Sequence, residues 1–182
     1  MKITVIGRGN VGGGLARLWR GAGHDVDELG KDGGDASGSN AVLMAVPSDA
    51  IADALGKVSG LDGKVTIDAT NALGGRSDEF DSLAEQVKSI AGGPTAKAFN
   101  LNFANAYDEV PQQPLKPSMP WCGDDGAGET TEQLIRDAGY EPVGVGGLDK
   151  ARTLEDALGF VFAVRQAADS PVFYRFWKPG EL

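Results

Sequence analysis

Cysteine and histidine are scarce in this sequence, and their scarcity excludes several kinds of site. Among 182 residues there is one cysteine, Cys122, and one histidine, His24. A single cysteine excludes an internal disulfide and a cysteine-rich metal cluster. We expect Cys122 to be a small buried hydrophobic residue at a strand end. His24 follows Gly23 at the start of a short predicted strand, where we expect a turn role rather than proton transfer. No metal site is predicted.

Positive charge and long apolar runs are also in short supply. The 17 basic and 26 acidic residues give a formal net charge of −9, which argues against a nucleic-acid partner because such partners require a basic face. An anionic ligand must therefore be held by local positive groups. No apolar run approaches the roughly 18 residues of a membrane span, and Met1-Lys2 enters a strand without a signal peptide. We expect a cytoplasmic protein without membrane contacts.

The remaining composition is that of a globular chain, with 41% hydrophobic and 24% charged residues. The length suits one domain. We expect residues 1–182 to form a single dinucleotide-binding domain, with residues 148–182 as a C-terminal helix and tail packed on it. The aromatic-rich segment 171–177 is expected to dock on the body of the domain.

The N-terminal segment carries the strongest pattern. An apolar strand, residues 3–6, leads into Gly7-x-Gly9-x-x-Gly12 and then into a helical pattern. In such a turn the first glycine permits the tight bend, the second lets a pyrophosphate approach the backbone, and the third lets the helix pack closely on the strand. The alternative is a glycine turn that merely joins a strand to a helix.

The helix after this turn begins near Asn10, and its free N–H groups and positive dipole end would face the phosphates. Gly13 and Gly14 lie inside it, where each glycine costs about 1 kcal/mol relative to alanine, so we expect something to require a close approach there. The predicted inward face consists of Val11, Leu15, Leu18 and Ala22.

Strands and helices alternate along the rest of the chain. Further strands are predicted at residues 24–29, 41–46, 65–69, 96–99, 119–122 and 140–145. Residues 30–40 are rich in glycine, serine and aspartate and predict a loop in place of a crossover helix. The alternation predicts an α/β protein with the NAD(P)-binding Rossmann fold, a doubly wound, mostly parallel sheet with helices on both faces.

The helices between these strands are predicted from caps and apolar stripes. Ser48 or Asp49 would cap a helix carrying Ile51, Leu55 and Val58, and Asp149 would cap a long C-terminal helix. A helix after Ser77 would bury Phe80, Leu83, Val87 and Ile90.

In a doubly wound sheet, ligands bind at the carboxyl ends of the strands near the topological switch point. Small or polar residues and a proline follow three of the predicted strands, which suits a ribose and a nicotinamide. The residues expected there are Val46, Pro47, Ser48, Thr70, Asn71 and Asn100. For each one, an ordinary strand-to-helix turn is the alternative.

The charges expected near the end of the second strand indicate which dinucleotide is bound. An NAD site has an acid at the end of the second strand for the ribose 2′-hydroxyl, whereas an NADP site has cations for the 2′-phosphate. Gly30 occupies the acid position here, Lys31 follows it, and Arg8 lies in the first turn. These residues favour NADP(H). The alternatives are ribose binding by Glu28 or Asp32, and a role for Arg8 and Lys31 as solvated surface charge.

The chain resembles the deazaflavin-dependent NADP oxidoreductases, the coenzyme F420 reductase family, and more distantly the cytosolic nucleotide domain of membrane metalloreductases. The order of the matching segments agrees from residue 2 to about residue 165. They are IGRGNVG (6–12), AVP (45–47), DATN (68–71), AKAFN (96–100), CGDD (122–125) and LDKARTLE (148–155).

The resemblance implies an NADP(H)-dependent oxidoreductase that transfers hydride between the nicotinamide and coenzyme F420 or another flavin-like, small-molecule acceptor. Such a reaction needs no general acid or base, so no catalytic side chain is predicted. The resemblance also implies a homodimer. Arg152 and Glu155 match the family pattern, although a helical ion pair between them explains both residues equally well.

Two departures bear on the acceptor. The helix after the second strand is missing, and Leu101-Asn102 stands where relatives often have threonine. Nucleotide binding depends less on these positions than deazaflavin use does. The alternatives are a non-catalytic protein that senses NADP(H), and a reductase of an unrelated small substrate.

Overall fold

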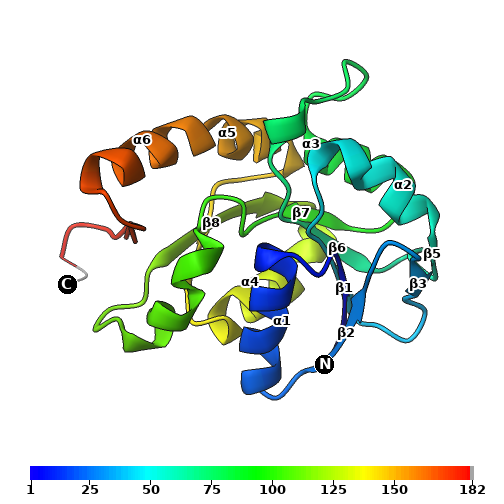
Figure 1. The fold of residues 1–182 in the computed structure, drawn as a ribbon, viewed down its shortest axis with the longest axis horizontal. Helices are drawn as coiled ribbons and strands as arrows, with labels where there is room; N and C mark the ends of the chain where they lie inside the picture. Colours follow the sequence, from blue (N-terminus) through cyan, green and yellow to red (C-terminus); the bar gives the residue numbers. More distant parts are fainter. Residues whose placement is uncertain (181–182) are drawn as a thin grey trace.

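The computed structural model describes residues 1–180, so the last two residues of the predicted C-terminal segment 148–182 lie outside the described residues. A seven-stranded sheet runs through the molecule in the order β2-β1-β4-β6-β7-β8-β9 (Figure 1). Its strands are β1 (Lys2–Ile6), β2 (Asp25–Leu29), β4 (Ala41–Met44), β6 (Val65–Asp68), β7 (Thr95–Lys97), β8 (Ser118–Gly123) and β9 (Glu141–Gly144).

All neighbouring strands run parallel except β7 and β8, which are antiparallel. The predicted mostly parallel sheet is therefore confirmed. The chain passes from β1 outward to β2 and then returns to place β4 on the other side of β1. That reversal is the topological switch point, where open α/β sheets bind ligands. The acidic strand β2 lies at one edge of the sheet, which explains how it tolerates its charges.

Helices cover both faces of the sheet, as predicted (Figure 1). One face carries α1 (Asn10–Gly21), the 3-10 helix η3 (Ala104–Gln112) and α4 (Gly128–Asp137). The other carries α2 (Ile51–Gly56), α3 (Leu83–Ala91) and α5 (Ala151–Asp156), and α6 (Leu158–Ala168) continues from α5. No helix within residues 1–180 is long and apolar enough to cross a membrane.

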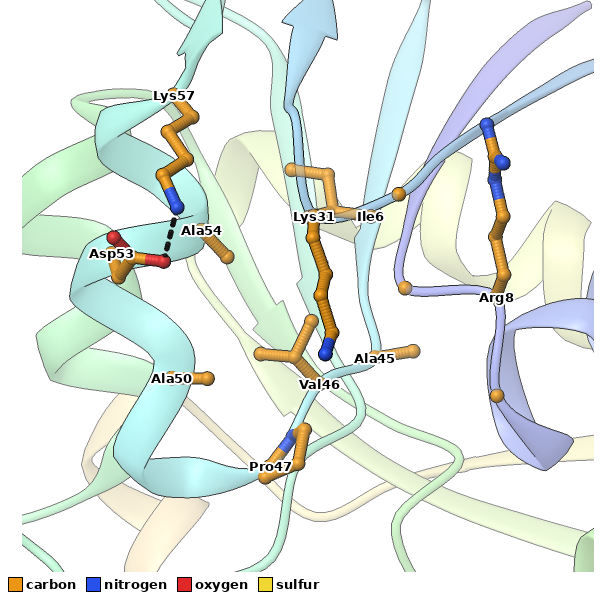
Figure 2. Close-up of a pocket in the computed structure, with 13 residues that line it drawn as sticks. Ile6, Arg8, Lys31, Ala45, Val46, Pro47, Ala50, Asp53, Ala54 and Lys57 are labelled. Atoms are coloured by element: carbon orange, nitrogen blue, oxygen red, sulfur yellow. Dashed lines mark hydrogen bonds and ion pairs between the residues drawn. The ribbon is translucent and has the colours of Figure 1, made fainter.

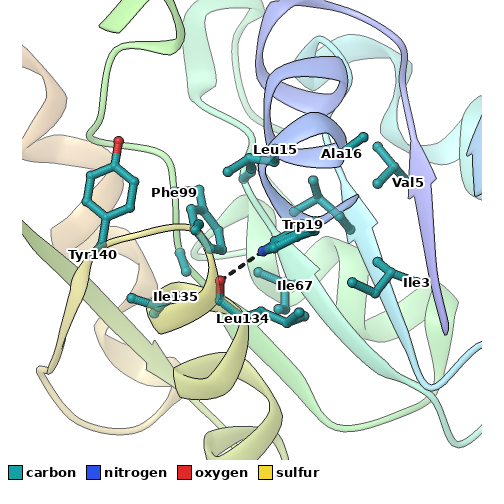
Figure 3. Close-up of a cluster of buried hydrophobic side chains, with 14 of the residues drawn as sticks. Ile3, Val5, Leu15, Ala16, Trp19, Ile67, Phe99, Leu134, Ile135 and Tyr140 are labelled. Atoms are coloured by element: carbon teal, nitrogen blue, oxygen red, sulfur yellow. Dashed lines mark hydrogen bonds between the residues drawn. The ribbon is translucent and has the colours of Figure 1, made fainter. Parts of the chain in front are cut away.

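The buried face of α1 differs from the predicted one. Ala16 and Trp19 are fully buried together with Leu15, whereas Ala22 is exposed. Trp19 donates its indole N–H to the carbonyl of Leu134 at 2.8 Å and meets the ring of Phe99 edge-on at 5.7 Å between centroids (Figure 3). The indole therefore joins α1 to α4 and sets the face that α1 turns inward.

Residues 30–40 contain no helix, so the predicted short crossover is confirmed. A two-residue strand, β3 (Gly34–Asp35), pairs instead with β5 (Val58–Ser59). Val58 is buried as part of this strand and not as part of the α2 stripe, because α2 ends at Gly56.

Several predicted helix starts are wrong. Ser48, Asp49 and Asp149 form no side-chain cap, since short 3-10 turns, η1 (Ser48–Ala50) and η5 (Leu148–Lys150), precede the α-helices there. The next helix begins only at Leu83, where the Ser82 hydroxyl accepts the Glu85 N–H at 3.2 Å. Phe80 therefore lies before it, and Ile90 is exposed. The long C-terminal helix is interrupted at Ala157 and forms α5 and α6.

The tail lies beside β8. The Tyr174 carbonyl accepts the Ser118 N–H at 2.9 Å, and the Phe176 N–H donates to the Ser118 hydroxyl at 2.8 Å. The Tyr174 hydroxyl donates to Asn102 Oδ1 at 2.9 Å. These bonds hold the described part of the tail against the body of the molecule.

Candidate functional site

The three glycines of the first turn occupy three different environments. Gly7 has φ +110°, and a Cβ there would collide with the carbonyl oxygen of Ala45. A Cβ at Gly12 would collide with the carbonyl oxygen of Gly7. Gly9, in contrast, has no atom within 4 Å of a Cβ position. The first and third glycines thus permit the turn and the packing, while the second borders open space at the start of α1.

The two extra glycines of α1 have different surroundings. A Cβ at Gly14 would lie 2.5 Å from a ring carbon of Tyr107, whereas a Cβ at Gly13 would meet its neighbours at ordinary distances. The close approach expected here is therefore made by η3, which packs the Tyr107 ring against the Gly14 backbone.

Three hollows follow one another along the carboxyl ends of the strands. The first has a volume of about 650 Å³, the middle one about 320 Å³ and the third about 420 Å³. Gly9, Val46 and Pro47 line both the first and the middle hollow. Asn10, Val11 and Asn71 line both the middle and the third. The shared walls make one groove that passes the switch point between β1 and β4.

Every predicted site residue except Gly12 lines this groove. The first hollow contains Gly7, Arg8, Gly9, Lys31, Val46 and Pro47, the middle one adds Asn10, Val11, Ser48, Thr70 and Asn71, and the third adds Asn100. Gly12 lies beneath the turn, where it packs against Gly7 and Val5. The structure therefore brings together residues that are up to 93 positions apart, from Gly7 to Asn100 (100 − 7 = 93).

Two basic residues flank the first hollow at the end of β2. The Lys31 side chain extends into it toward Val46, and Arg8 lies at the opposite side (Figure 2). Arg8 donates through Nε and Nη2 to the Glu28 carbonyl oxygen at 3.1 and 2.8 Å, which fixes its guanidinium over Gly30. Lys31 makes no ion pair with a carboxylate of residues 1–180, whereas the nearby Lys57 is paired with Asp53 at 2.7 Å.

The acids considered for an NAD-type ribose contact lie outside this hollow. Neither Glu28 nor Asp32 is among its lining residues. The Glu28 carboxylate accepts a hydrogen bond from Arg20 at 2.7 Å instead. The acid that does line the hollow, Asp53, is paired with Lys57, so the charged groups left for a ribose substituent at this end of the groove are basic.

The middle hollow is lined mostly by apolar and small groups. Val46 and Pro47 lie at the end of β4, and Thr70 and Asn71 at the end of β6. The Ser48 hydroxyl accepts the Gly74 N–H at 3.1 Å, which ties the turn after β6 to the turn after β4. A flat apolar ring fits such a wall better than a charged group does.

Asn71 and Asn100 are joined to each other where the middle and third hollows meet. Asn71 Nδ2 donates to the Asn100 carbonyl oxygen at 2.8 Å. Asn100 Nδ2 donates to Asn71 Oδ1 at 3.1 Å and to the Leu154 carbonyl oxygen at 3.0 Å. These bonds orient the Asn100 amide and leave its Oδ1, which is buried, without a partner among residues 1–180.

A buried ion network lies behind these asparagines, and sequence reasoning did not predict it. Lys97 Nζ lies 2.7 Å from Asp68 Oδ2 and 3.1 Å from Glu155 Oε1, and all three side chains are completely buried. Arg76 closes the network by donating to Glu155 Oε2 at 2.6 Å. Two cations, the buried Lys97 and the partly exposed Arg76, thus balance two buried anions, and a buried charge requires such pairing.

This network also holds the backbone of the site. Lys97 Nζ donates to the Thr70 carbonyl oxygen at 2.7 Å, and Asp68 Oδ1 accepts the Thr70 N–H at 2.9 Å. Both backbone polar groups of Thr70 are therefore fixed immediately before Asn71. The signal in the sequence was a charged residue inside each of two otherwise apolar strand segments, Asp68 after Ile67 and Lys97 between two alanines.

Glu155 does not form the helical ion pair with Arg152 that was considered from the sequence. Arg152 is paired with Asp156 at 2.9 Å, on the exposed side of α5. The side chain of Glu155 faces inward, where its Oε1 also accepts the Leu83 N–H at 2.8 Å.

The cysteine and the histidine lie outside the groove. Cys122 is buried and free, as predicted, and burial raises the pKa of its thiol to about 12. His24 Nε2 lies 2.8 Å from Asp137 Oδ2 at the end of α4. Within residues 1–180, no group of three or more histidine, cysteine or acidic side chains is placed to hold a metal ion.

The similarity of this chain to known proteins lies in its structure. No protein-family model matches the sequence, and no curated protein matches it. A protein from Arthrobacter sp. FB24, provisionally assigned as an F420-dependent NADP reductase, superimposes with a TM-score of 0.82 at 20% identity, over 98% of this chain and 100% of that one.

More distant structures share the fold over less of their length. A hypothetical protein, SMa0349 of Sinorhizobium meliloti, gives a TM-score of 0.65 at 26% identity over 82% of this chain and 86% of its own. A reductive aminase of Aspergillus terreus, solved with NADPH, gives 0.69 at 13% identity over 92% of this chain and 63% of the aminase. Together with the strand order, these similarities establish that the chain has the NAD(P)-binding Rossmann fold.

Proposed function

We propose that this protein is an NADP(H)-dependent oxidoreductase that transfers hydride between the nicotinamide and a small flavin-like acceptor, coenzyme F420 or a related ring. One observation carries the proposal. A continuous groove runs past the switch point of a Rossmann sheet, with two basic side chains at one end and a pair of bonded asparagines toward the other.

The residues that line the groove fit NADP(H) in one orientation, with its 2′-phosphate in the first hollow and its nicotinamide in the middle hollow. Arg8 and Lys31 would hold the 2′-phosphate, because both line the first hollow at the end of β2. The open space at Gly9 and the start of α1 would receive the pyrophosphate. Val46, Pro47, Thr70 and Asn71 would then border the nicotinamide in the middle hollow.

The bound dinucleotide supplies the hydride chemistry, and the chain supplies position and electrostatics. The Asn71–Asn100 pair would orient the ring edges where the middle and third hollows meet. The Lys97 network would keep the Thr70 backbone in place behind them. Proximity of this kind contributes a large share of the rate in reactions that need no proton transfer from the protein.

The acceptor is proposed from the resemblance in sequence and from the assignment of the Arthrobacter protein. The test is oxidation of NADPH at saturating coenzyme F420, with FMN and FAD in parallel reactions. Turnover with at least one of these rings is expected, with F420 the fastest. Tight NADPH binding without turnover of any ring would favour a sensor of NADP(H) or a reductase of an unrelated substrate.

We further propose that the chain acts as a single domain and forms a homodimer in the cytoplasm, where NADPH is supplied. Exposed aromatic side chains on α6 and the tail, Phe160 at 73%, Phe176 at 58% and Trp177 at 49%, support self-association. Sedimentation at micromolar concentration should give the mass of two chains, and a monomer alone would rule the dimer out.

A further inference from the structure

The third hollow, beyond the two asparagines, contains one charged side chain. Its polar lining consists mainly of asparagine amides, including Asn71, Asn100 and Asn102, and its apolar lining includes Phe103 and Phe162. The charged residue is Arg165, which reaches the hollow from α6.

Arg165 is held in place without being neutralised. Its guanidinium carbon lies 4.8 Å from the centroid of the Phe103 ring. That ring in turn lies 5.9 Å from the ring of Phe162. A cation over an aromatic face is attracted to the ring, but the ring carries no opposite charge. The contact therefore orients the guanidinium and leaves its positive charge uncompensated.

No carboxylate of residues 1–180 lies within ion-pair distance of Arg165. Asp169, one helical turn later, borders an adjoining hollow together with Arg165 and Phe162, yet forms no salt bridge with Arg165. Arg165 is thus a cation beside a hollow, without a carboxylate partner among residues 1–180, in a chain with a formal net charge of −9. Its planar, fork-like donors match a phosphate or carboxylate in both shape and charge.

We propose that Arg165 is a specificity-determining residue that holds a negatively charged substituent of the hydride acceptor. The third hollow then selects planar acceptors that carry a phosphate or carboxylate over neutral acceptors with the same ring. This inference rests on the proposed function. Phe103 and Phe162, which both line the hollow, offer the ring an aromatic surface.

The test compares acceptors that share a ring and differ in whether they carry a phosphate or carboxylate group. FMN and riboflavin share one ring, and only FMN carries a phosphate. Coenzyme F420 and its hydroxy-deazariboflavin core, which lacks the phosphate and carboxylates of the side chain, form a second such pair. We expect Arg165→Gln to raise the KM for FMN and F420 by about tenfold, the loss of one charge-assisted hydrogen bond. The KM for riboflavin and for the deazaflavin core should remain unchanged.

Two variants control for structure. Arg165→Lys keeps the charge without the planar fork and should restore part of the preference for FMN. Arg136→Gln removes an exposed arginine of α4 that is paired with Glu132, outside the groove, and should change neither KM. Equal increases in KM for charged and neutral acceptors in Arg165→Gln, or no increase for either, would overturn the proposal.

Failure of the proposed function can be distinguished from failure of the role proposed for Arg165. If no acceptor turns over while NADPH still binds, the affinities for FMN and riboflavin are measured by quenching of flavin fluorescence with NADP⁺ bound. A preference for FMN that Arg165→Gln abolishes would support the role of Arg165 without turnover. Equal affinities for FMN and riboflavin in the unaltered protein would contradict it.

Discussion

Lys31 and Arg8 are the residues on which the proposed preference for NADP(H) over NAD(H) depends. Both line the first hollow, and neither Glu28 nor Asp32 does. Arg8 already uses two of its donors on the Glu28 carbonyl oxygen, so Lys31 is the freer cation. Lysine provides a point charge rather than a bidentate fork, and we therefore expect the preference for NADPH to be moderate.

Replacing either residue with alanine should weaken NADPH binding more than NADH binding. A hydrogen bond to a charged group contributes about 1.5–3 kcal/mol, so each variant should lose roughly tenfold or more in NADPH affinity. Lys57→Ala is the matched control, because Lys57 borders the same hollow but is paired with Asp53. Titration of each variant with both cofactors measures the effect, and equal losses for NADPH and NADH would reject the assignment.

Substitution of Lys97 tests whether the buried ion network stabilises the fold. In Lys97→Met, Asp68 and Glu155 would remain buried with one cation fewer, and breaking a buried ion pair in this way costs about 3–5 kcal/mol. Urea unfolding should show a loss of that size. Arg152→Met breaks the exposed pair with Asp156 and should cost less than about 1 kcal/mol. Similar stabilities of the two variants would show that the network does not support the fold.

The residues that line the groove were predictable because they follow apolar strands, and the ends of parallel strands meet at one edge of a sheet. The roles of Lys97 and Glu155 could not be predicted in this way, because they depend on partners that are distant in the sequence. The ion pair between Lys97 and Asp68 spans 29 positions and the bond from Arg76 to Glu155 spans 79. Helical spacing allowed Arg152 as a partner of Glu155. The Glu155 side chain is buried, however, and its arginine partner is Arg76.

At the scale of elements, α1 shows how packing sets the sequence of a helix. Gly14→Ala would place a methyl group against the Tyr107 ring, and overpacking of this kind costs about 1–3 kcal/mol. Gly21→Ala is the control, since nothing lies within 4 Å of a Cβ at the exposed end of α1. This second variant should gain up to about 1 kcal/mol. Thermal unfolding measures both, and a stabilised Gly14→Ala would contradict the packing of η3 on α1.

Strands were easier to predict than helix ends. The central strands of this sheet, such as β1, β4 and β6, are short and mainly apolar segments bounded by glycine, proline or polar residues, a pattern that is visible in the sequence. The helices begin with 3-10 turns at Ser48 and Leu148, where a serine or aspartate occurs without acting as a cap. The break at Ala157 has no proline or glycine at that position, so the periodicity of the apolar residues passes through it.

For the molecule as a whole, the ionisation of the tyrosine side chains distinguishes the folded from the unfolded chain. The chain has three, Tyr107, Tyr140 and Tyr174. Burial raises the pKa of all three phenols above the ordinary value of 10.0. Tyr107 and Tyr140 are completely buried, and their hydroxyl groups have no hydrogen-bond partner among residues 1–180.

A raised pKa in the folded state links stability to pH. Each neutral phenol contributes stability below its unfolded pKa, and that contribution is lost as the pH rises through the folded pKa. The free energy of unfolding should therefore fall above about pH 10. Tyrosinate absorbance should stay low in the native protein at pH values where the same chain in urea has fully ionised. Coincident titrations of the native and the unfolded chain would show that the three side chains are exposed.

The proposed function depends on whether the groove binds the dinucleotide that its basic end predicts. Calorimetric titration of the protein with NADPH and, separately, with NADH tests this most directly. We expect one site per chain, with NADPH bound at least several-fold more tightly than NADH. The absence of binding would contradict the proposed function, and a tighter complex with NADH would contradict the proposed preference for NADP(H).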